Sequence, residues 1–293
     1  MKKMFMVVIV LMMTLSASAQ FYIYYSDGTV AKVDSISMIA PKGTEQPDPS
    51  AGIGAFSVSN SKQVTFSPGN LQYHPANDEW RFAESQTDYI GEANSNISET
   101  YYGWLDLFGW STSANNFGVS TSTNENDYSG SFVDWGTNKI GNDTPDTWRT
   151  LTSDEWDYLL NTRTNASDLR GVAQVNGVNG LILLPDAWVC PEGIAFKSGF
   201  HSSYGAAYYA AYQTFTAEQW SKLESEGAVF LPAAGMRFGW NVSYVQYYGD
   251  YWSATEYYDV SKYALRFDFG SDGEKTCGSG RFNGQSVRLV KDL

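Results

Sequence analysis

The sequence contains very few of the residues from which catalytic and metal centres are usually built. Its 293 residues include two histidines, His74 and His201, and two cysteines, Cys190 and Cys277. These four residues form none of the metal-ligand spacings H-x-x-x-H, H-E-x-x-H or C-x-x-C, so the sequence gives no support to a transition-metal site. The Gly-x-Ser-x-Gly, P-loop and dinucleotide-binding motifs are also missing. We therefore expect no catalytic residues, no metal site and no cofactor.

Basic residues are scarce as well. There are 19 Lys and Arg residues against 32 Asp and Glu residues, which gives a net charge of −13 at pH 7. No run of Lys and Arg is available to neutralise nucleic-acid phosphates, and an anionic membrane surface repels an acidic protein. Acidic segments such as 124–127 and 268–274 offer oxygen ligands for calcium, but no EF-hand loop is present, so calcium is the weaker alternative to solvated carboxylates. We expect neither nucleic acid nor a membrane surface as a partner.

Long apolar runs are limited to one short segment at the start of the chain. Lys2 and Lys3 precede the apolar run Phe5–Leu15, and Ala17-Ser18-Ala19 then supplies a small-residue cleavage site. The run is too short to span a bilayer, and no second run of spanning length follows. Residues 1–19 are therefore predicted to be a cleaved signal peptide. The protein is expected to be exported, as a periplasmic, cell-surface or secreted protein without membrane insertion after cleavage.

The two cysteines, Cys190 and Cys277, are an even pair, and exported proteins commonly carry disulfides. Whether these thiols are bridged depends on the distance between their Cα atoms, which the sequence does not give. A disulfide and two free thiols are both open at this stage. His201 follows Cys190 in the sequence, but no motif supports a thiol–imidazole pair, and a loop histidine is the simpler interpretation.

Three segments follow the signal peptide. Residues 20–40 contain two β-rich runs, Tyr22–Tyr25 and Val30–Val33, on either side of an Asp-Gly turn, which predicts a β-hairpin leader. Residues 41–54 are rich in Pro, Gly and polar residues and predict a linker. Residues 55–293 remain as one large domain. Aromatic residues make up 16% of the chain, which is enough for both a core and a recognition surface.

Short strands and two main helices are predicted within this domain. The helix signals are two capping boxes, at 152–155 and 216–219, each followed by apolar residues on one face. Residues 101–136 mix aromatics with Gly, Ser, Thr and Asn, which predicts ordered loops attached to a core by their aromatic side chains. Apolar runs between turn residues predict short strands at 56–58, 63–66, 71–73, 80–82, 180–184 and 229–235. The predicted fold class is α+β.

The C-terminal stretch 251–290 gives the clearest indication of function. Residues 262–269 alternate in polarity, which predicts a strand with two different faces. One set is predicted to face the core (Tyr263, Leu265, Phe267, Phe269) and the other to face away from it (Lys262, Ala264, Arg266, Asp268). Gly- and Ser-rich turns are predicted at 270–273 and 278–280, and a terminal strand at 286–290. An apolar frame that carries polar and aromatic residues on its other face is typical of a binding surface.

Three spaced motifs in this stretch, YWSAT (251–255), ALRF (264–267) and RFNGQSVRLV (281–290), resemble the C-terminal end of bacterial C-type-lectin-fold proteins. Within that fold the chain is most similar to the branch of the formylglycine-generating enzymes, the major-paralogous-domain group and the variable proteins of diversity-generating retroelements. The segment 148–156 is similar to a helix entry of that branch, although Thr150-Leu151 replaces its usual Leu-Pro. The resemblance covers residues 55–293 and implies a C-type-lectin-like fold, loop-rich and with two main helices.

The resemblance does not bring an enzymatic activity with it. Formylglycine-generating enzymes need two closely spaced cysteines near this region to hold copper, and here Cys277 stands alone. The related sulfur-transferring iron oxygenases need a cluster of histidine and carboxylate residues that is also missing. An enzyme of the formylglycine-generating type is therefore a disfavoured alternative, because a shared scaffold does not imply a shared activity. A tip or cap subunit of a surface filament is a second alternative.

In the variable proteins of this branch, the residues between the apolar framework positions contact the ligand. The resemblance therefore implies a ligand surface near the C-terminus, and the local density of Tyr agrees with it, because Tyr supplies a large contact area at low entropic cost. The predicted contact residues are Trp240, Tyr244, Tyr247, Tyr248, Tyr257, Tyr258, Asp259, Arg266, Asp268, Asp272, Glu274 and Arg281. We expect non-catalytic recognition or adhesion at the bacterial cell exterior, with a protein or a glycan as the ligand.

Overall fold

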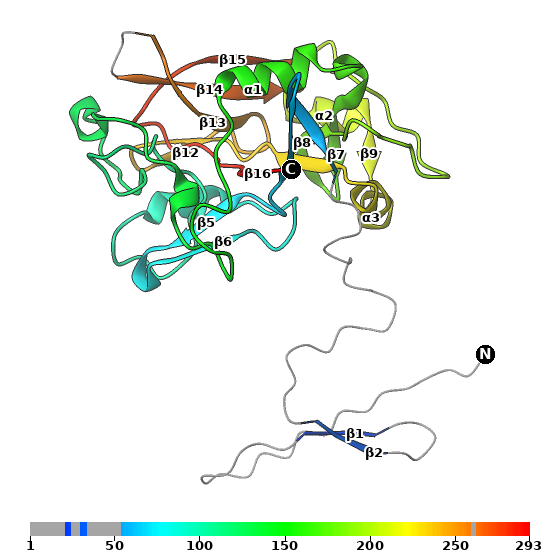
Figure 1. Cartoon of the computed structure of the whole chain (residues 1–293), viewed down its shortest axis with the longest axis horizontal. Coiled ribbons are helices and arrows are strands. Elements are labelled where there is room, and N and C mark those ends of the chain that lie inside the picture. Colours follow the sequence, from blue (N-terminus) through cyan, green and yellow to red (C-terminus); the bar gives the residue numbers. More distant parts are fainter. Residues whose placement is uncertain (1–20, 25–29, 34–53, 259–261) are drawn as a thin grey trace. The chain divides into compact units, whose positions relative to one another are not determined.

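A computed structural model describes residues 21–24, 30–33, 54–258 and 262–293 (Figure 1). The predicted signal peptide, the hairpin turn and nearly all of the predicted linker lie outside the described residues. The chain divides into two units, Met1–Asp48 and Pro49–Leu293. In the first unit, β1 (Phe21–Tyr24) pairs antiparallel with β2 (Val30–Val33), and this pairing agrees with the predicted hairpin.

The second unit is a mixed α+β structure made of short strands in small sheets and a few short helices (Figure 1). Its strands are β3 (Phe56–Ser59), β4 (Lys62–Phe66), β5 (Leu71–His74), β6 (Glu79–Phe82), β7 (Arg170–Val175), β8 (Val178–Leu183), β9 (Thr214–Phe215), β10 (Val229–Pro232), β11 (Met236–Phe238), β12 (Asn241–Ser243), β13 (Gly249–Glu256), β14 (Tyr263–Gly270), β15 (Gly273–Gly280) and β16 (Val290–Asp292). Its α-helices are α1 (Ser153–Asp157), α2 (Ala206–Tyr212) and α3 (Ala217–Ser225). The α+β fold class predicted from the sequence is confirmed.

These strands form one four-stranded sheet, two three-stranded sheets and two hairpins, and two of these sheets position the site. The first is β13-β14-β15, and the second is β10-β8-β7-β9, in which only β9 pairs in parallel, with β7. Strand β16 pairs with β4, which brings the end of the described chain against the first strands of this unit in the sheet β16-β4-β3. The hairpins β5-β6 and β11-β12 complete the pairing. All the strands predicted before residue 236 are present, with bounds that differ by one to three residues.

Both predicted capping boxes are confirmed. At α1, the Thr152 hydroxyl accepts from the Glu155 backbone N–H, and the Glu155 carboxylate accepts from the Thr152 backbone N–H. At α3, Thr216 and Gln219 make the same reciprocal bonds. These bonds satisfy backbone donors that the first turn of a helix leaves free. Helix α1 is short and continues into a π-helical turn, Tyr158–Thr162.

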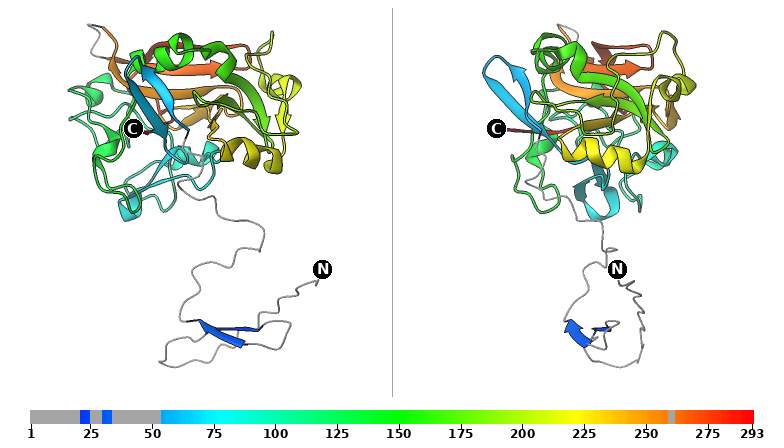
Figure 2. Two further views of the ribbon diagram at one scale, coloured as in Figure 1. Left: turned by 45° about the vertical axis from the view of Figure 1, so that its right-hand side comes forward. Right: turned by 90° about the vertical axis from the view of Figure 1, so that its right-hand side faces the viewer.

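Helix α1 packs on one face of the β13-β14-β15 sheet (Figures 1 and 2). The Trp156 ring lies on the Phe267 ring, with 4.9 Å between centroids and 24° between planes. Phe269 is stacked on Tyr251 on the same face, at 6.2 Å. These side chains belong to one buried cluster, which places the predicted core-facing residues Phe267 and Phe269 in the core.

The segment 101–136 contains no α-helix and no strand longer than a single bridge, which agrees with the predicted ordered loops. One indole N–H attaches it to distant backbone, and a second joins two parts of the segment. Trp110 Nε1 donates to the Ser253 carbonyl at 2.8 Å, and Trp135 Nε1 donates to the Phe117 carbonyl at 3.0 Å. Because both indoles are buried, these hydrogen bonds satisfy donors that water does not reach.

Two predictions for the C-terminal stretch are wrong. The predicted turn at 278–280 lies inside β15, because β14 extends to Tyr263 and the ladder runs without a shift up to the pair Tyr263–Gly280. The predicted strand at 286–290 is replaced by isolated bridges, and regular pairing starts only at Val290. In both segments the partner strand, which the sequence does not show, decides which residues form the ladder.

Candidate functional site

The β13-β14-β15 sheet carries three of the twelve residues predicted to contact a ligand, Arg266, Asp268 and Glu274, and Asp272 lies in the turn between β14 and β15. Neither face of the sheet is fully exposed. The face opposite α1 carries Ala264 and Trp252, which belong to a second buried cluster together with Trp110. Farther along β14 the same face carries Arg266 and Asp268, and Asp268 is itself buried. The set of residues predicted to point away from the core is therefore partly inside a second core. Tyr263 was predicted to face inward and is instead well exposed.

A row of charged side chains crosses this face. Arg266 Nη1 lies 3.0 Å from Asp250 Oδ1, and Arg266 Nη2 donates to Asp268 Oδ2 at 3.0 Å. Lys275 Nζ lies 4.0 Å from the same Asp268 oxygen. Burial raises the pKa of Asp250 to about 6, although Arg266 acts in the opposite direction. One guanidinium therefore compensates two buried carboxylates.

The Cys277 thiol belongs to this row and donates to Asp268 Oδ2 at 3.1 Å. Burial and this hydrogen bond raise the pKa of Cys277 above its ordinary value, so the thiol stays protonated at neutral pH. Cys190 is exposed, and its thiol donates to the Ile194 carbonyl. Both cysteines are free thiols, which resolves the two alternatives left open by the sequence.

Four predicted contact residues are occupied by contacts within the protein. Arg266 and Asp268 are held in the charged row, and Glu274 accepts from Arg170 Nε at 2.8 Å with its side chain almost fully buried. Arg281 is only 2% exposed, so its prediction as a ligand contact is wrong. Its guanidinium donates to the carbonyls of Tyr128 and Gly130 and lies 4.3 Å from the centre of the Trp110 ring.

Four exposed or half-exposed tyrosines lie together at the C-terminal end of β14, where this strand meets the turn to β15. We call them the tyrosine cluster: Tyr204, Tyr244, Tyr247 and Tyr248. The Tyr204 ring is stacked on Tyr248 with 5.0 Å between centroids, and Tyr244 meets Tyr248 edge-on at 5.5 Å. The Tyr209 hydroxyl donates to the Tyr247 carbonyl at 2.8 Å, so a buried side chain of α2 fixes the backbone of the cluster.

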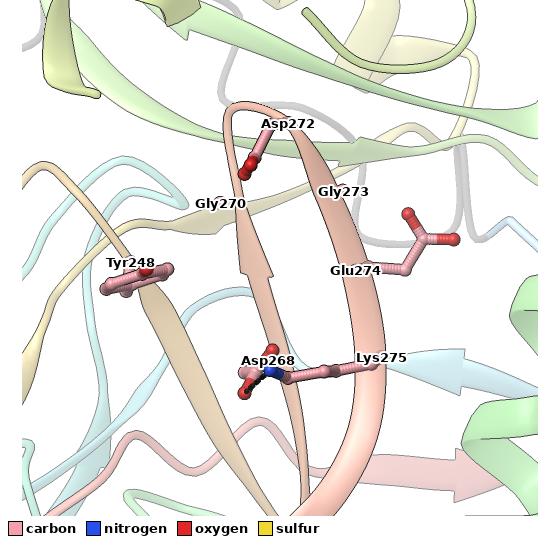
Figure 3. Close-up of a pocket in the computed structure, with 7 residues that line it drawn as sticks. All are labelled: Tyr248, Asp268, Gly270, Asp272, Gly273, Glu274 and Lys275. Atoms are coloured by element: carbon pink, nitrogen blue, oxygen red, sulfur yellow. Dashed lines mark ion pairs between the residues drawn. The ribbon is translucent and has the colours of Figure 1, made fainter. Parts of the chain in front are cut away.

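A pocket of about 250 Å³ adjoins the tyrosine cluster (Figure 3). Its lining residues are Tyr248, Asp268, Gly270, Asp272, Gly273, Glu274 and Lys275. Figure 3 shows the Tyr248 ring on one side of the hairpin and Asp272 at its turn, with Asp268 and Lys275 farther along the strands. Asp272 is exposed and forms no ion pair with any described residue. Asp272 and Lys275 are therefore the charged groups of this pocket that a ligand can reach.

The remaining predicted contact residues lie elsewhere. Tyr257 and Tyr258 follow the far end of β13, where the Tyr257 ring lies 5.7 Å from Tyr258 and 6.4 Å from Tyr263. Eight-residue β14 separates this end from the tyrosine cluster by about 23 Å, at about 3.3 Å per residue. Trp240 is exposed in the turn between β11 and β12, and Asp259 lies outside the described residues. The single predicted surface is thus divided into two.

Sequence reasoning missed Tyr204, which belongs to the cluster but lies about 40 residues before it in the chain. The Tyr-rich segment 204–212 was the available signal, but it did not show which of these rings are exposed. Tyr209 is buried, whereas Tyr204 and Tyr208 are exposed, and the His201 ring lies 4.5 Å from Tyr208. Only the packing of α2 on β7 and β8 determines which of these tyrosines are buried and which are exposed.

A second pocket, of about 350 Å³, is lined by Asp146, Thr147, Trp148, Arg149, Lys291 and Asp292. Its arginine is engaged within the protein, since Arg149 pairs with Glu155 at 2.8 Å and with Asp292 at 2.7 Å. In the described ranges, no three His, Cys, Asp or Glu side chains are grouped so that they could hold a metal ion. Of the helices described, none combines the length and apolarity needed to cross a membrane.

Comparison with known proteins adds no relative: the chain matches no protein-family model, no curated protein and no solved structure. The geometry of the tyrosine cluster and its pocket is therefore the basis for the function proposed below.

Proposed function

We propose that this protein is an exported, non-catalytic recognition protein with a C-type-lectin-like fold, which binds a protein or glycan ligand at the bacterial cell exterior. Export rests on the signal peptide expected at residues 1–19, and the fold assignment rests on the resemblance of residues 55–293. The binding site proposed is the tyrosine cluster together with the adjoining pocket. The residues Tyr257, Tyr258 and Trp240 are left out of this site, because they lie at other places in the fold.

One observation carries the proposal: four tyrosine rings contact one another at the surface, beside a pocket that holds accessible opposite charges. Tyr rings that pack against one another offer a large contact area and lose little side-chain entropy when a ligand binds. The pocket adds polar groups that fix the orientation of a ligand, namely the Asp272 carboxylate and the Lys275 ammonium. The Tyr209 hydroxyl fixes the backbone of the cluster at Tyr247, and Arg266 holds Asp268 in the lining of the pocket.

The alternative of an enzyme of the formylglycine-generating type receives no support from the two thiols. Thiolate is the metal ligand and the nucleophile in cysteine chemistry. The Cys277 thiol is instead a hydrogen-bond donor to a carboxylate, and its pKa is raised. This geometry favours a structural thiol within the charged row over a reactive one.

The test is a screen of the full exported chain on glycan and surface-protein arrays, followed by titration of the strongest hit with three variants. We expect Tyr247→Ala and Asp272→Asn each to weaken binding about 30-fold, since truncation of a hot-spot residue costs about 2 kcal/mol. The matched control is Tyr258→Ala, an exposed tyrosine at the opposite end of the sheet, which should bind like the parent chain. Loss of binding in Tyr258→Ala alone would show that the site is at the other end and that the assignment is wrong.

A further inference from the structure

The outer strand of the β13-β14-β15 sheet, β15, presents an unused row of backbone hydrogen-bonding groups. Its pairing with β14 runs from Gly270–Gly273 to Tyr263–Gly280 without a shift. Opposite residues in an antiparallel ladder alternate between pairs that exchange hydrogen bonds and pairs that do not. Because the two-residue turn Ser271-Asp272 makes Gly270–Gly273 a bonded pair, residues 275, 277 and 279 bond to β14. Residues 274, 276, 278 and 280 therefore direct their backbone groups outward.

Two hydrogen bonds at the C-terminal end of the strand support this assignment. The Gly280 carbonyl accepts from the Asn283 backbone N–H at 3.0 Å, outside the ladder. This is expected for a residue whose backbone groups point away from β14. The Arg281 backbone N–H donates to the Lys262 carbonyl at 3.0 Å, toward the β14 side. This continues the pattern in which odd-numbered residues bond to β14. Within residues 54–258 and 262–293, the N–H and C=O groups of Glu274, Thr276 and Gly278 have no hydrogen-bond partner. Three donors and three acceptors thus remain free along this edge.

This edge is accessible and carries only one of the features that usually prevent strand addition, the charge of Lys275. Figure 1 shows β15 at the rim of the molecule, as the last strand of its sheet. Thr276 and Gly278 are partly exposed, and the Lys275 side chain is 67% exposed. Natural edge strands are normally protected by proline, by bulges or by a covering element. Strand β15 contains no proline and no bulge, and Lys275 is its single protruding charge.

The charges beside this edge favour a second copy of the same strand. Consider two copies of β15 paired antiparallel and centred on Thr276. Glu274 then faces Gly278 of the second copy, and Thr276 faces its own equivalent. All three free N–H groups and all three free C=O groups of each copy are then hydrogen-bonded to the other copy. Lys275 then lies opposite Cys277 of the second copy, whose thiol is bonded to Asp268, so the ammonium approaches a carboxylate. Glu274 faces a glycine, and Arg170 already compensates its charge. A pair centred on Lys275 would instead place two ammonium groups opposite each other.

We propose that the protein self-associates through β15, as a two-fold antiparallel strand pair centred on Thr276 that joins the two sheets. The pocket lined by Gly273, Glu274 and Lys275 lies on this same strand, so the pair brings two ligand sites close together and raises avidity for a repeated ligand. The pairing itself does not depend on the proposed ligand function. A net charge of −13 on each chain opposes association, so the dimer is expected to tighten as salt screens the repulsion.

The first test is sedimentation velocity of the full exported chain over a range of protein and salt concentrations. We expect a monomer–dimer equilibrium that shifts toward dimer at higher protein concentration and higher salt. Thr276→Pro should abolish the dimer, because it removes the central outward N–H. It should leave the fold intact, since that N–H makes no bond to β14. Thr276→Val is the matched control and should dimerise. A monomer under all conditions, or a dimer that persists in folded Thr276→Pro, would overturn the proposal.

A cross-link tests the register independently. Lys275→Cys places a thiol opposite Cys277 of the second copy in a non-bonded pair, where the Cα atoms are about 4.5 Å apart and within disulfide range. With glutathione disulfide as the oxidant, each pair of thiols should become one disulfide while two molecules of glutathione are released. We expect a covalent dimer whose cross-linked peptide joins the introduced thiol to Cys277. Lys275→Cys combined with Cys277→Ser should lose that link. A Lys275→Cys chain that stays monomeric on oxidation, or links only through Cys190, contradicts this register.

Discussion

Arg266 and Asp250 form a buried ion pair across β13 and β14, with 3.0 Å between Nη1 and Oδ1. Asp250 is 3% exposed, and the same guanidinium also holds Asp268 at 3.0 Å. The strand register explains the contact, because Asp250 lies directly opposite Asp268, and Arg266 is two residues from it on the same face. Two carboxylates side by side in a buried position require a cation between them. Arg266 therefore has a structural role, because it holds Asp250 and also Asp268, which lines the pocket.

Arg266→Ala should therefore destabilise the fold by about 3–5 kcal/mol, which is the usual cost of leaving a buried charge without its partner. Urea unfolding followed by fluorescence of the buried tryptophans measures the change. Asp250→Asn in the Arg266→Ala background is the informative second variant, because it removes the uncompensated charge and should restore part of the lost stability. An Arg266→Ala chain with an unchanged unfolding midpoint would contradict the structural role of this residue.

The contact between Trp156 and Phe267 predicts a second large effect. Phe267→Ala leaves a cavity under α1 and removes the stacked pair, so we expect the free energy of unfolding to fall by about 3–5 kcal/mol. The control is Tyr258→Ala, which truncates a ring that is 81% exposed and should change stability by no more than about 0.5 kcal/mol. Thermal melts of the two variants beside the parent chain give the comparison, and equal melting temperatures would be inconsistent with this core.

The buried carboxyl groups predict a stability maximum at mildly acidic pH. Burial raises the pKa of Asp106 from 3.8 to about 6, although hydrogen bonds from Asn94 and Ile90 oppose the shift. Between these two values the folded state binds more protons than the unfolded state, so stability rises as the pH falls from 7 toward 4.5. Glu155 acts in the opposite way: burial tends to raise its pKa, but hydrogen bonds from Arg149 and Thr152 hold it below 4.5. Its contribution is lost at still lower pH.

Denaturant unfolding at a series of pH values should therefore show the highest unfolding free energy between about pH 4.5 and 6. Asp106→Asn keeps the shape of the side chain but removes its titration, so part of the rise between pH 7 and 5 should disappear in this variant. A parent chain whose stability decreases steadily from pH 7 to pH 5 would show that other groups dominate.

Two glycines with positive φ angles make a matched pair for backbone effects. A Cβ atom on Gly118 (φ +74°) would lie 1.8 Å from the Gly109 carbonyl oxygen, whereas one on Gly141 (φ +56°) meets nothing within 4 Å. Gly118→Ala combines left-handed strain with a backbone clash and should cost about 3–5 kcal/mol. Gly141→Ala adds strain alone, about 1–2 kcal/mol. Chemical denaturation separates the two, and equal losses would mean that the clash at Gly118 is relieved by a shift of the loop.

The sequence by itself determined the features that depend on near neighbours. The capping box at Thr152 and Glu155 needs only two side chains and the backbone between them, so its four-residue pattern was sufficient. The alternation around Phe267 placed this ring in the core, because side chains in a strand point to opposite faces in turn. The α+β class followed from such local patterns. The C-type-lectin-like fold and the recognition function remain proposals.

Only the tertiary structure decided which polar and aromatic side chains are free to meet a ligand. The Arg281 guanidinium donates to the carbonyls of Tyr128 and Gly130, about 150 residues earlier in the chain. No local sequence pattern predicts such a contact. Tyr204 joins Tyr248 for the same reason, because α2 packs on the sheet formed by β7 and β8 and brings the two rings together. A charged or aromatic residue in a sequence shows what it can bind. The partners that the fold places around it decide whether that capacity is already used within the protein.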